Sequence, residues 1–356
     1  MPVQDQSFIY TIWKKLRRNK GAVFGLIVII LAIITALFAY VLAPDATPDA
    51  NRIIVEIAAK KPGYQQQFFL QKKETKPSGS FLFGSEDDVH YIPITSYKQK
   101  GDTIFTEKYV DDEVTEPMWF IVNENSTSTF ITTKTFWLGT DKFGRDILSR
   151  LIVGVRVSLS VGLIAVLISL TVGIFFGAVA GYFRGWIDEA ILWLINVVWS
   201  IPTLLLVFAI TLALGKGFWQ VFIAVGLTLW VNVARLVRGQ ILSIRELNYI
   251  EATKAMGFSH SRTIFKHILP NIMGPVIVIA ASNFASAIVI EAGLSFLGVG
   301  VQAPQPSWGL MIKENYNFII TNNPMLAIAP GIAIMLLVLA FNLLGNGLRD
   351  VLDVRN

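Results

Sequence analysis

Long stretches of apolar residues that carry no Asp, Glu, Lys or Arg dominate this chain. Each of these stretches is long enough to cross about 30 Å of hydrocarbon as an α-helix, at a rise of about 1.5 Å per residue. They occupy residues 21–44, 157–183, 190–215, 217–234, 268–290 and 324–345. The pattern therefore predicts a membrane protein with six transmembrane helices.

Basic residues at the ends of these stretches predict their orientation, because Lys and Arg near short loops stay on the cytoplasmic side. Positive charges cluster before the first stretch, in residues 235–267 and in the C-terminal tail. Both termini are therefore expected to be cytoplasmic. The first stretch also has the basic flank of a signal peptide, but it is too long and lacks a clear small-x-small cleavage pattern, which favours an uncleaved anchor.

The segment between the first two stretches differs in composition from the rest and is predicted to be an extracytoplasmic insert. Gln67–Lys72 and Thr103–Val110 are rich in aromatic and β-branched residues, and Lys100-Gly101-Asp102 precedes the second as a turn would. These patterns favour a small β-rich domain. A loosely ordered loop stays open as the alternative, because few positions alternate cleanly.

The predicted fold class is thus an all-α polytopic membrane protein with a small β-rich extracytoplasmic insert. Residues 1–44 are expected to form the cytoplasmic N-terminus and the first transmembrane helix, and residues 45–137 the insert. Residues 138–356 are expected to form a five-helix core with a cytoplasmic loop at residues 238–270. No repeat or low-complexity tract subdivides the chain further.

The composition excludes several kinds of chemistry. The residues are 53% hydrophobic and 15% charged, whereas about one quarter are charged in an average soluble domain. Orientation and lipid headgroups explain the net charge of +5, which therefore does not indicate nucleic-acid binding. Cysteine and the P-loop pattern are absent, and the three histidines have no partners at metal-ligand spacing. We expect no catalytic residue, no metal site and no cofactor bound by this chain.

Mildly polar residues inside the predicted helices are candidates for the lining of a transport path. These candidates are Asn196, Ser200, Asn283 and Ser286. The alternative is helix–helix packing, which is favoured for any single residue because small polar side chains let helices approach and hydrogen-bond. The helix interiors hold no ionisable side chains, which argues against a carrier driven by protons or sodium. Pro202, inside the third stretch, would allow a kink.

The loop between the fourth and fifth stretches carries the most specific pattern. Glu251-Ala252-Thr253-Lys254-Ala255-Met256-Gly257 is followed, after nine residues, by His267-Ile268-Leu269-Pro270. Residues 247–256 are predicted to form a short helix ended by Gly257, and Pro270 suits the first turn of the next helix. An apolar patch that would dock in a groove of a soluble partner is expected from Ile250, Ala252, Ala255 and Met256.

This loop resembles the EAA loop of ATP-binding cassette importer permeases. The family pattern is Glu-Ala-Ala, three residues, Gly, nine residues and Ile-x-Leu-Pro, from which Thr253 and His267 are small departures. The resemblance implies the type I importer permease fold in a bacterial inner membrane. It also implies coupling to cytoplasmic ATPases through Glu251, Ala252, Lys254, Gly257, Leu269 and Pro270.

Two further segments, residues 138–150 and 291–309, resemble signatures of the C-type permease subunit of oligopeptide, dipeptide and nickel importers. The signature residues are Gly139, Asp141, Gly144, Arg145, Asp146, Glu291, Gly298, Pro304 and Trp308. The first segment is expected to form a turn and an external amphipathic helix in which Asp141, Arg145 and Asp146 can pair, and Trp308 is expected at the membrane interface. Residues 50–133 look additional to the family pattern.

The resemblance implies a permease subunit that catalyses nothing itself and forms a path for peptides with a homologous B-type permease subunit. Two ABC ATPase subunits would use ATP and magnesium, and an extracytoplasmic substrate-binding protein would deliver the peptide. Nickel or another small solute is the alternative cargo. A membrane sensor or scaffold that uses the insert, and a secondary transporter, are the alternatives of other classes.

Overall fold

The computed structural model describes residues 8–73, 79–101, 103–121, 131–215, 217–320 and 323–352. They fall into two compact units. The first, the helical unit, comprises the chain up to Ile33, Ser158–Gln302 and the chain from Ile334; the second, the sheet unit, comprises Ile34–Val157 and Ala303–Ala333. Three helices, α2, α4 and α12, continue along the chain from one unit into the other.

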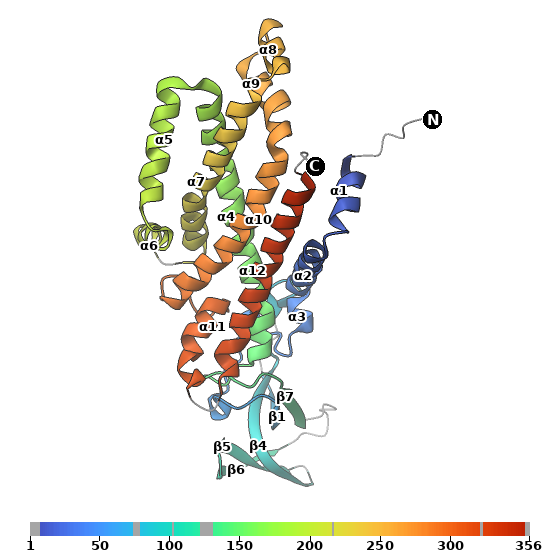
Figure 1. The fold of residues 1–356 in the computed structure, drawn as a ribbon. Helices are drawn as coiled ribbons and strands as arrows, with labels where there is room; N and C mark the ends of the chain where they lie inside the picture. Colours follow the sequence, from blue (N-terminus) through green and yellow to red (C-terminus); the bar gives the residue numbers. More distant parts are fainter. Residues whose placement is uncertain are drawn as a thin grey trace, which may run out of the picture. The chain divides into compact units, whose positions relative to one another are not determined.

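Long apolar helices make up the helical unit (Figure 1). The helices that contribute to it are α1 (Phe8–Leu16), α2 (Lys20–Leu37), α4 (Ile147–Phe183), α5 (Gly185–Ser200), α6 (Thr203–Leu214), α7 (Phe218–Ile244), α8 (Asn248–Ala255), α9 (His260–Thr263), a π-helical turn (Ile264–Ile268), α10 (Leu269–Phe296) and α12 (Met325–Leu352). In the described chain, α2, α4, α7, the run from α9 through α10, and α12 are each long and apolar enough to cross a membrane. Five of the predicted stretches therefore correspond to a candidate span.

The third predicted stretch, residues 190–215, does not form one straight helix. α5 ends at Ser200, α6 begins at Thr203, and the two are bent by 95°. Pro202 lies at the break, because proline cannot donate a backbone hydrogen bond and disfavours helical backbone in the residue before it. The described chain thus has five candidate spans, or six if the bent pair counts as one. The prediction of six transmembrane helices is confirmed only to that extent.

Glycines allow the closest helix approaches in the helical unit. A Cβ on Gly25 of α2 would overlap the carbonyl oxygen of Ala340 on α12, and one on Gly347 would overlap Ala22. Gly173 and Gly177 bring α4 equally close to α7. Packing of this kind, rather than water exclusion, holds helices together inside a membrane.

An antiparallel sheet of five strands forms the centre of the sheet unit (Figure 1). Its strands lie in the order β6 (Val114–Ile121), β5 (Thr103–Asp111), β4 (Val89–Lys100), β1 (Tyr64–Lys72) and β7 (Ile131–Phe136). Phe68 and Phe69 are neighbours on β1 and point to opposite faces, where each belongs to a buried apolar cluster. The predicted β-structure between the first two candidate spans is therefore confirmed, and the all-α class is corrected to a helical membrane protein that carries a substantial sheet.

Short elements complete the sheet unit. They are α3 (Ala39–Leu42), the 3₁₀ turns Pro48–Ala50 and Val55–Ile57, a small hairpin of β2 (Gly79–Ser80) and β3 (Gly84–Ser85), α11 (Trp308–Asn315) and the 3₁₀ turn Tyr316–Ile319. α4 begins at Ile147, well before the predicted start at residue 157. The expected separate amphipathic helix is therefore wrong: the turn after residue 139 leads directly into a helix of 37 residues. At about 1.5 Å per residue, that helix is longer than the hydrocarbon layer.

We predict that Gly25→Val lowers the thermal stability of the protein in detergent, because the new side chain must push α2 away from α12. Overpacking of this kind costs about 1–3 kcal/mol. The matched control is Gly331→Val, also a glycine inside a long apolar helix, where a Cβ would meet nothing within 4 Å. Equal melting temperatures for the two variants would contradict the close approach.

Candidate functional site

The loop between α7 and α10 folds into a compact group of short helices. α8 ends before Gly257, whose φ of +74° lies in the left-handed region that favours glycine. The N–H of Phe258 donates to the carbonyl of Thr253 at 3.0 Å, which closes the end of the helix. Pro270 lies in the first turn of α10, as expected.

One face of α8 is held inside the protein. Ile250 is fully buried in a cluster that includes Ile264, Ile268 and Ile272. The hydroxyl of Thr253 is also buried and lies 2.7 Å from the Ile250 carbonyl, to which it donates. The predicted apolar patch is therefore wrong in one member, because Ile250 packs against the chain's own core.

The opposite face of α8 is exposed. After Ile250 its exposed residues are Glu251, Ala252 and Ala255, and Met256 and Phe265 are exposed further along the same loop. Met256 is 63% exposed and Phe265 69% exposed. Large apolar side chains that gather on a surface mark an interaction site more often than isolated ones do. We call these five residues the exposed α8 face; the side chain of Lys254 lies outside the described residues.

Polar contacts fix the base of this loop to the rest of the helical unit. The hydroxyl of Tyr182 lies 2.9 Å from Nδ1 of His260, and Arg245 donates to the Tyr182 carbonyl at 2.5 Å. Arg238 forms a two-pronged ion pair with Asp188, with nitrogen–oxygen distances of 2.5 and 2.7 Å. Sequence reasoning did not single out these partners, because residues 182 and 260 are 78 positions apart and no spacing rule joins them.

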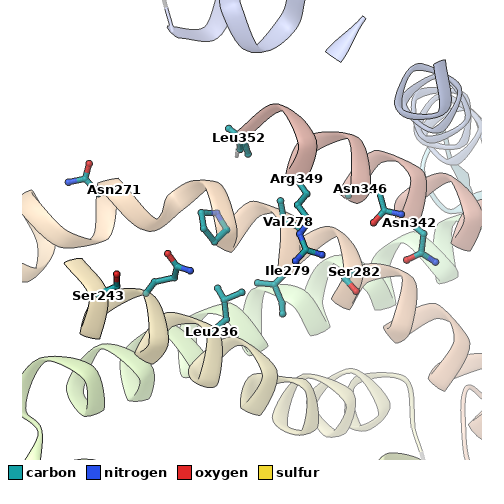
Figure 2. Close-up of a pocket in the computed structure, with 13 residues that line it drawn as sticks. Leu236, Ser243, Asn271, Val278, Ile279, Ser282, Asn342, Asn346, Arg349 and Leu352 are labelled. Atoms are coloured by element: carbon teal, nitrogen blue, oxygen red, sulfur yellow. The ribbon is translucent and has the colours of Figure 1, made fainter. Parts of the chain in front are cut away.

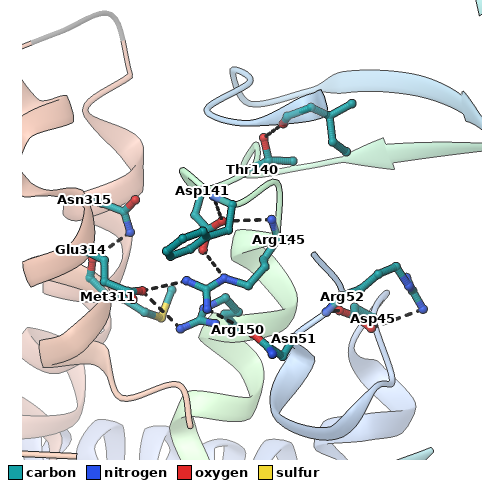
Figure 3. Close-up of polar contacts among 12 residues, drawn as sticks. Asp45, Asn51, Arg52, Thr140, Asp141, Arg145, Arg150, Met311, Glu314 and Asn315 are labelled. Carbon is teal, nitrogen blue, oxygen red and sulfur yellow. Dashed lines mark hydrogen bonds and ion pairs between the residues drawn. The ribbon is translucent and has the colours of Figure 1, made fainter. Parts of the chain in front are cut away.

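A buried ionic cluster surrounds the first signature segment in the sheet unit (Figure 3). One carboxylate oxygen of Asp141 accepts from the N–H groups of Phe143 and Arg145, at 2.8 and 3.0 Å. The other accepts from Nε of Arg145 at 2.6 Å, and Nη2 of Arg145 donates to Glu314 at 2.9 Å. Arg150 is fully buried, 3.5 Å from the same Glu314 carboxylate. The pairing of Asp141 with Arg145 is thus present as expected, whereas sequence reasoning missed Glu314.

Asp146 does not take part in this pairing. Its carboxylate accepts from the N–H of Ser149 at 2.9 Å and so caps the first turn of α4. Burial raises its pKa, an effect that the hydrogen bonds from Ser149 oppose. Gly144 and Gly139, with φ of +73° and +80°, shape the turn, and a Cβ on either would overlap a backbone carbonyl of residues 54 or 60. This segment therefore serves the packing of the sheet unit.

Lys134 on β7 is a partly buried cation next to this cluster. Its Nζ lies 4.3 Å from the centre of the Tyr91 ring. Burial, together with the positive charge of Arg52, lowers the pKa of Lys134 to about 8. Its positive charge is therefore unfavourable in the folded protein at neutral pH.

The second signature segment has two well-defined parts. Glu291 is buried and accepts from the hydroxyl of Ser295 at 2.6 Å, and the backbone turns at Gly298 with φ of +83°. Trp308 is only 3% exposed, and its indole N–H donates to the carbonyl of Leu151 at 3.0 Å. The expectation that this tryptophan lies at the membrane interface is therefore wrong, because the Trp308 ring fills the space beside Gly154 of α4. Pro304 is exposed.

The four candidates for a path lining each have a different hydrogen-bond partner. Asn283 is buried and donates to Ser169 of α4 at 3.3 Å and to the Leu229 carbonyl of α7 at 3.4 Å, which is a packing role. Asn196 accepts from Arg235 at 3.1 Å. The hydroxyls of Ser200 and Ser286 donate to carbonyls of their own segments. Within the described chain no hydrogen bond joins the four.

A different set of polar residues lines a pocket of about 810 Å³ between α7, α10 and α12 (Figure 2). These residues are Gln240, Ser243, Asn271, Ser282, Asn342, Asn346 and Arg349. Figure 2 shows Asn342, Asn346 and Arg349 on successive turns of α12. Sequence reasoning missed this pocket, although the spacing of these three residues at i, i+4 and i+7 is the signal for one helix face.

Comparison with known families identifies two matching regions. Residues 173–356 match the family described as the binding-protein-dependent transport system inner membrane component. Residues 7–62 match the N-terminal TM domain of oligopeptide transport permease C. Together these matches cover both ends of the chain.

Individual relatives agree with these matches. The dipeptide transport system permease protein DppC of Alkalihalophilus pseudofirmus is 44% identical over 217 residues, which cover 61% of this chain and 71% of the relative. The glutathione transport system permease protein GsiD of Pectobacterium atrosepticum is 42% identical over 217 residues, 61% of this chain and 72% of the relative. The oligopeptide transport system permease protein OppC of Bacillus subtilis is 39% identical over 220 residues, which cover 62% of this chain and 72% of the relative.

Among solved structures, a chain of the inward-facing MetNI methionine ABC transporter is similar to this one, and the match covers 58% of this chain and 97% of that chain. The sequence identity is 20% and the TM-score 0.48. This likeness is distant, and the relatives above carry the assignment.

We predict that Arg145→Met strongly destabilises the protein, because Asp141 and Glu314 would lose the cation that both contact. Removing one partner of a buried pair costs about 3–5 kcal/mol. Thermal unfolding of the purified protein measures the effect. Lys142→Met, three residues earlier and exposed, is the control and should melt like the unaltered protein. A normal melting temperature for Arg145→Met would show that the cluster does not stabilise the fold.

We predict that stability rises with pH above about 8 because of Lys134. Between about pH 8 and pH 10 this lysine is neutral when folded and protonated when unfolded, so the unfolded state binds more protons there. Lys134→Met should remove this rise and should melt at a higher temperature than the unaltered protein at pH 7. Lys98→Met, at an exposed position on β4, is the control. Parallel stability curves for Lys134→Met and the unaltered protein would contradict the assignment.

Proposed function

We propose that this chain carries peptides, because it belongs to the family of binding-protein-dependent transport system inner membrane components. In this family it is a permease subunit of an ATP-binding cassette importer and not an enzyme. Relatives named for dipeptide, glutathione and oligopeptide transport support this cargo. The match to the N-terminal domain of oligopeptide transport permease C points the same way. Nickel or another small solute is the alternative cargo.

The observation that carries the proposed mechanism is the two-sided packing of α8. Ile250 and Thr253 hold one side in the protein core, and the exposed α8 face has no covering segment in the described chain. A helix that is fixed on one side and apolar on the other can transmit movement from a partner that grips it. We assign this face to a cytoplasmic ATPase, with Glu251, Ala252, Lys254 and Gly257 in the coupling segment and Leu269 and Pro270 at its junction with α10.

The pocket between α7, α10 and α12 is our candidate for part of the peptide path. Amide and hydroxyl groups can exchange hydrogen bonds with a peptide backbone without selecting its side chains. Asn196, Ser200 and Ser286 stay candidates for other parts of the path, whereas the contacts of Asn283 favour packing. The path itself would lie between this chain and a second permease.

The complete importer would contain several further chains. We propose a homologous B-type permease, two ATPase subunits that use ATP and magnesium, and an extracytoplasmic binding protein that delivers the peptide. This chain would bind no cofactor itself. The signature residues between Gly139 and Asp146 would keep the sheet unit folded, and the exposed Pro304 would face the other external components.

The proposed topology counts α5 and α6 as one crossing, which gives six spans with both termini cytoplasmic. Residues 1–44, 45–137 and 138–356 would then be the first span, the extracytoplasmic insert and the permease core with its coupling loop at residues 238–270. The sheet of the insert distinguishes this chain from a plain helical bundle. A sensor or scaffold that uses this insert is the alternative of another class.

Affinity purification from the native membrane in mild detergent, followed by mass spectrometry, tests the proposal. Recovery of two ATPases and a second permease supports the importer. Uptake of labelled peptides into vesicles that contain the purified complex then tests the cargo. Recovery of this chain without an ATPase favours the sensor or scaffold. Uptake of nickel but not of peptides would overturn the cargo alone.

We predict that Gly257→Val uncouples ATP hydrolysis from transport. Valine at positive φ costs about 1–2 kcal/mol and disturbs the end of α8, next to the exposed α8 face. Gly185→Val is the matched control, because Gly185 also has positive φ and open space for a Cβ but is the first residue of α5. Peptide uptake and ATPase activity in vesicles measure the effect. Equal uptake by the two variants would contradict the coupling role.

A further inference from the structure

The small hairpin of β2 and β3 presents three consecutive large apolar side chains. Phe81, Leu82 and Phe83 join its strands and are 55%, 45% and 72% exposed. The residues that follow Ser85 are acidic, Glu86, Asp87 and Asp88, so the apolar run is confined to the turn. We call these three residues the hairpin tip. Exposed apolar clusters on an otherwise polar segment mark interaction sites.

The hairpin is fixed to the chain that follows the first candidate span. The N–H of Ser85 donates to the carbonyl of Ala46 at 3.0 Å. Gly84 has φ of +80°, and a Cβ there would lie 2.7 Å from the same carbonyl and 3.0 Å from the Tyr40 ring. The position of the tip is therefore set by its neighbours rather than by its own short strands.

The end of α2 lies beside the tip. Phe38 follows the last residue of this candidate span, and its ring meets that of Phe81 edge to face at 5.8 Å between centroids. Leu37 and Phe38 are 54% and 46% exposed, as expected of residues that face lipid. The tip is thus continuous with an apolar surface that lies at the boundary of the membrane.

Arg156 of α4 provides a second marker of that boundary. It is the last charged residue before the long uncharged part of α4, so it stands where this helix enters the hydrocarbon. Its guanidinium donates to the carbonyl of Leu82 and lies 5.3 Å from the centre of the Tyr40 ring. Aromatic residues and arginine together are typical of the headgroup region of a bilayer.

We propose that the hairpin tip inserts between the headgroups of the lipid leaflet at this end of α2 and α4, with Arg156 next to the lipid phosphates. The occupant is lipid rather than a soluble protein, because the tip continues the lipid-facing surface of α2 and touches markers of the boundary on two spans. The insertion would anchor the sheet unit at the membrane surface. This inference depends on the spans alone and not on the substrate or the partners.

A single fluorescent label tests the insertion. The chain has no cysteine, so Phe83→Cys in the full-length protein carries an environment-sensitive dye at one position. The control is Val114→Cys, an apolar residue of β6 that is 52% exposed. Both proteins are placed in vesicles of phosphatidylethanolamine and phosphatidylglycerol, with or without lipids that carry a nitroxide near the headgroup, and iodide is the quencher from water.

We expect the emission of the dye at position 83 to shift to the blue and to fall at least about twofold with the nitroxide lipids, as for a side chain at the interface. The dye at position 114 should respond to iodide and not to the lipids. Equal iodide quenching at both positions would overturn the insertion. Protection of position 83 from both quenchers would also overturn it, because a protein would then cover the tip.

Discussion

Hydrocarbon offers no hydrogen-bond partner to a backbone N–H or C=O, and most features of this chain follow from that constraint. Each candidate span of the described chain is a helix that satisfies its own backbone, and around Pro202, between α5 and α6, this ladder of hydrogen bonds is interrupted. The helices then gain stability from close packing rather than from the exclusion of water. Gly25, Gly173 and Gly177 serve this packing by letting backbones touch.

Buried charges are also costly in hydrocarbon, and the ion pairs of this chain lie at helix ends or in the sheet unit. The pair of Arg238 with Asp188 lies near the ends of its helices, and the cluster around Arg145 lies in the sheet unit. Burial makes each cluster costly unless every charge has a partner, which is why Glu314 accompanies two arginines. These ion pairs therefore lie at helix ends of the helical unit or within the sheet unit.

The short helix α8 is buried on one side and exposed on the other. Its buried side depends on Ile250, which packs into the same apolar cluster as residues of α7 and α10. Its other side leaves Ala252 and Ala255 exposed, and Met256, directly after the helix, is 63% exposed. Ile250 therefore ties α8 to a core that it shares with α7 and α10, two of the helices that line the pocket.

Local patterns in the sequence were sufficient to predict the candidate spans, the strands around residues 67–72 and 103–110, the end of α8 at Gly257 and the pairing of Asp141 with Arg145. These features depend on periodicity, on φ at one residue or on contacts within one turn. The inward side of Ile250, the burial of Trp308, the partner Glu314 and the polar pocket depend instead on which helices lie next to each other. Only the tertiary structure decided them, because a side chain's environment is set by segments far away in the chain, and no spacing within the sequence records that contact.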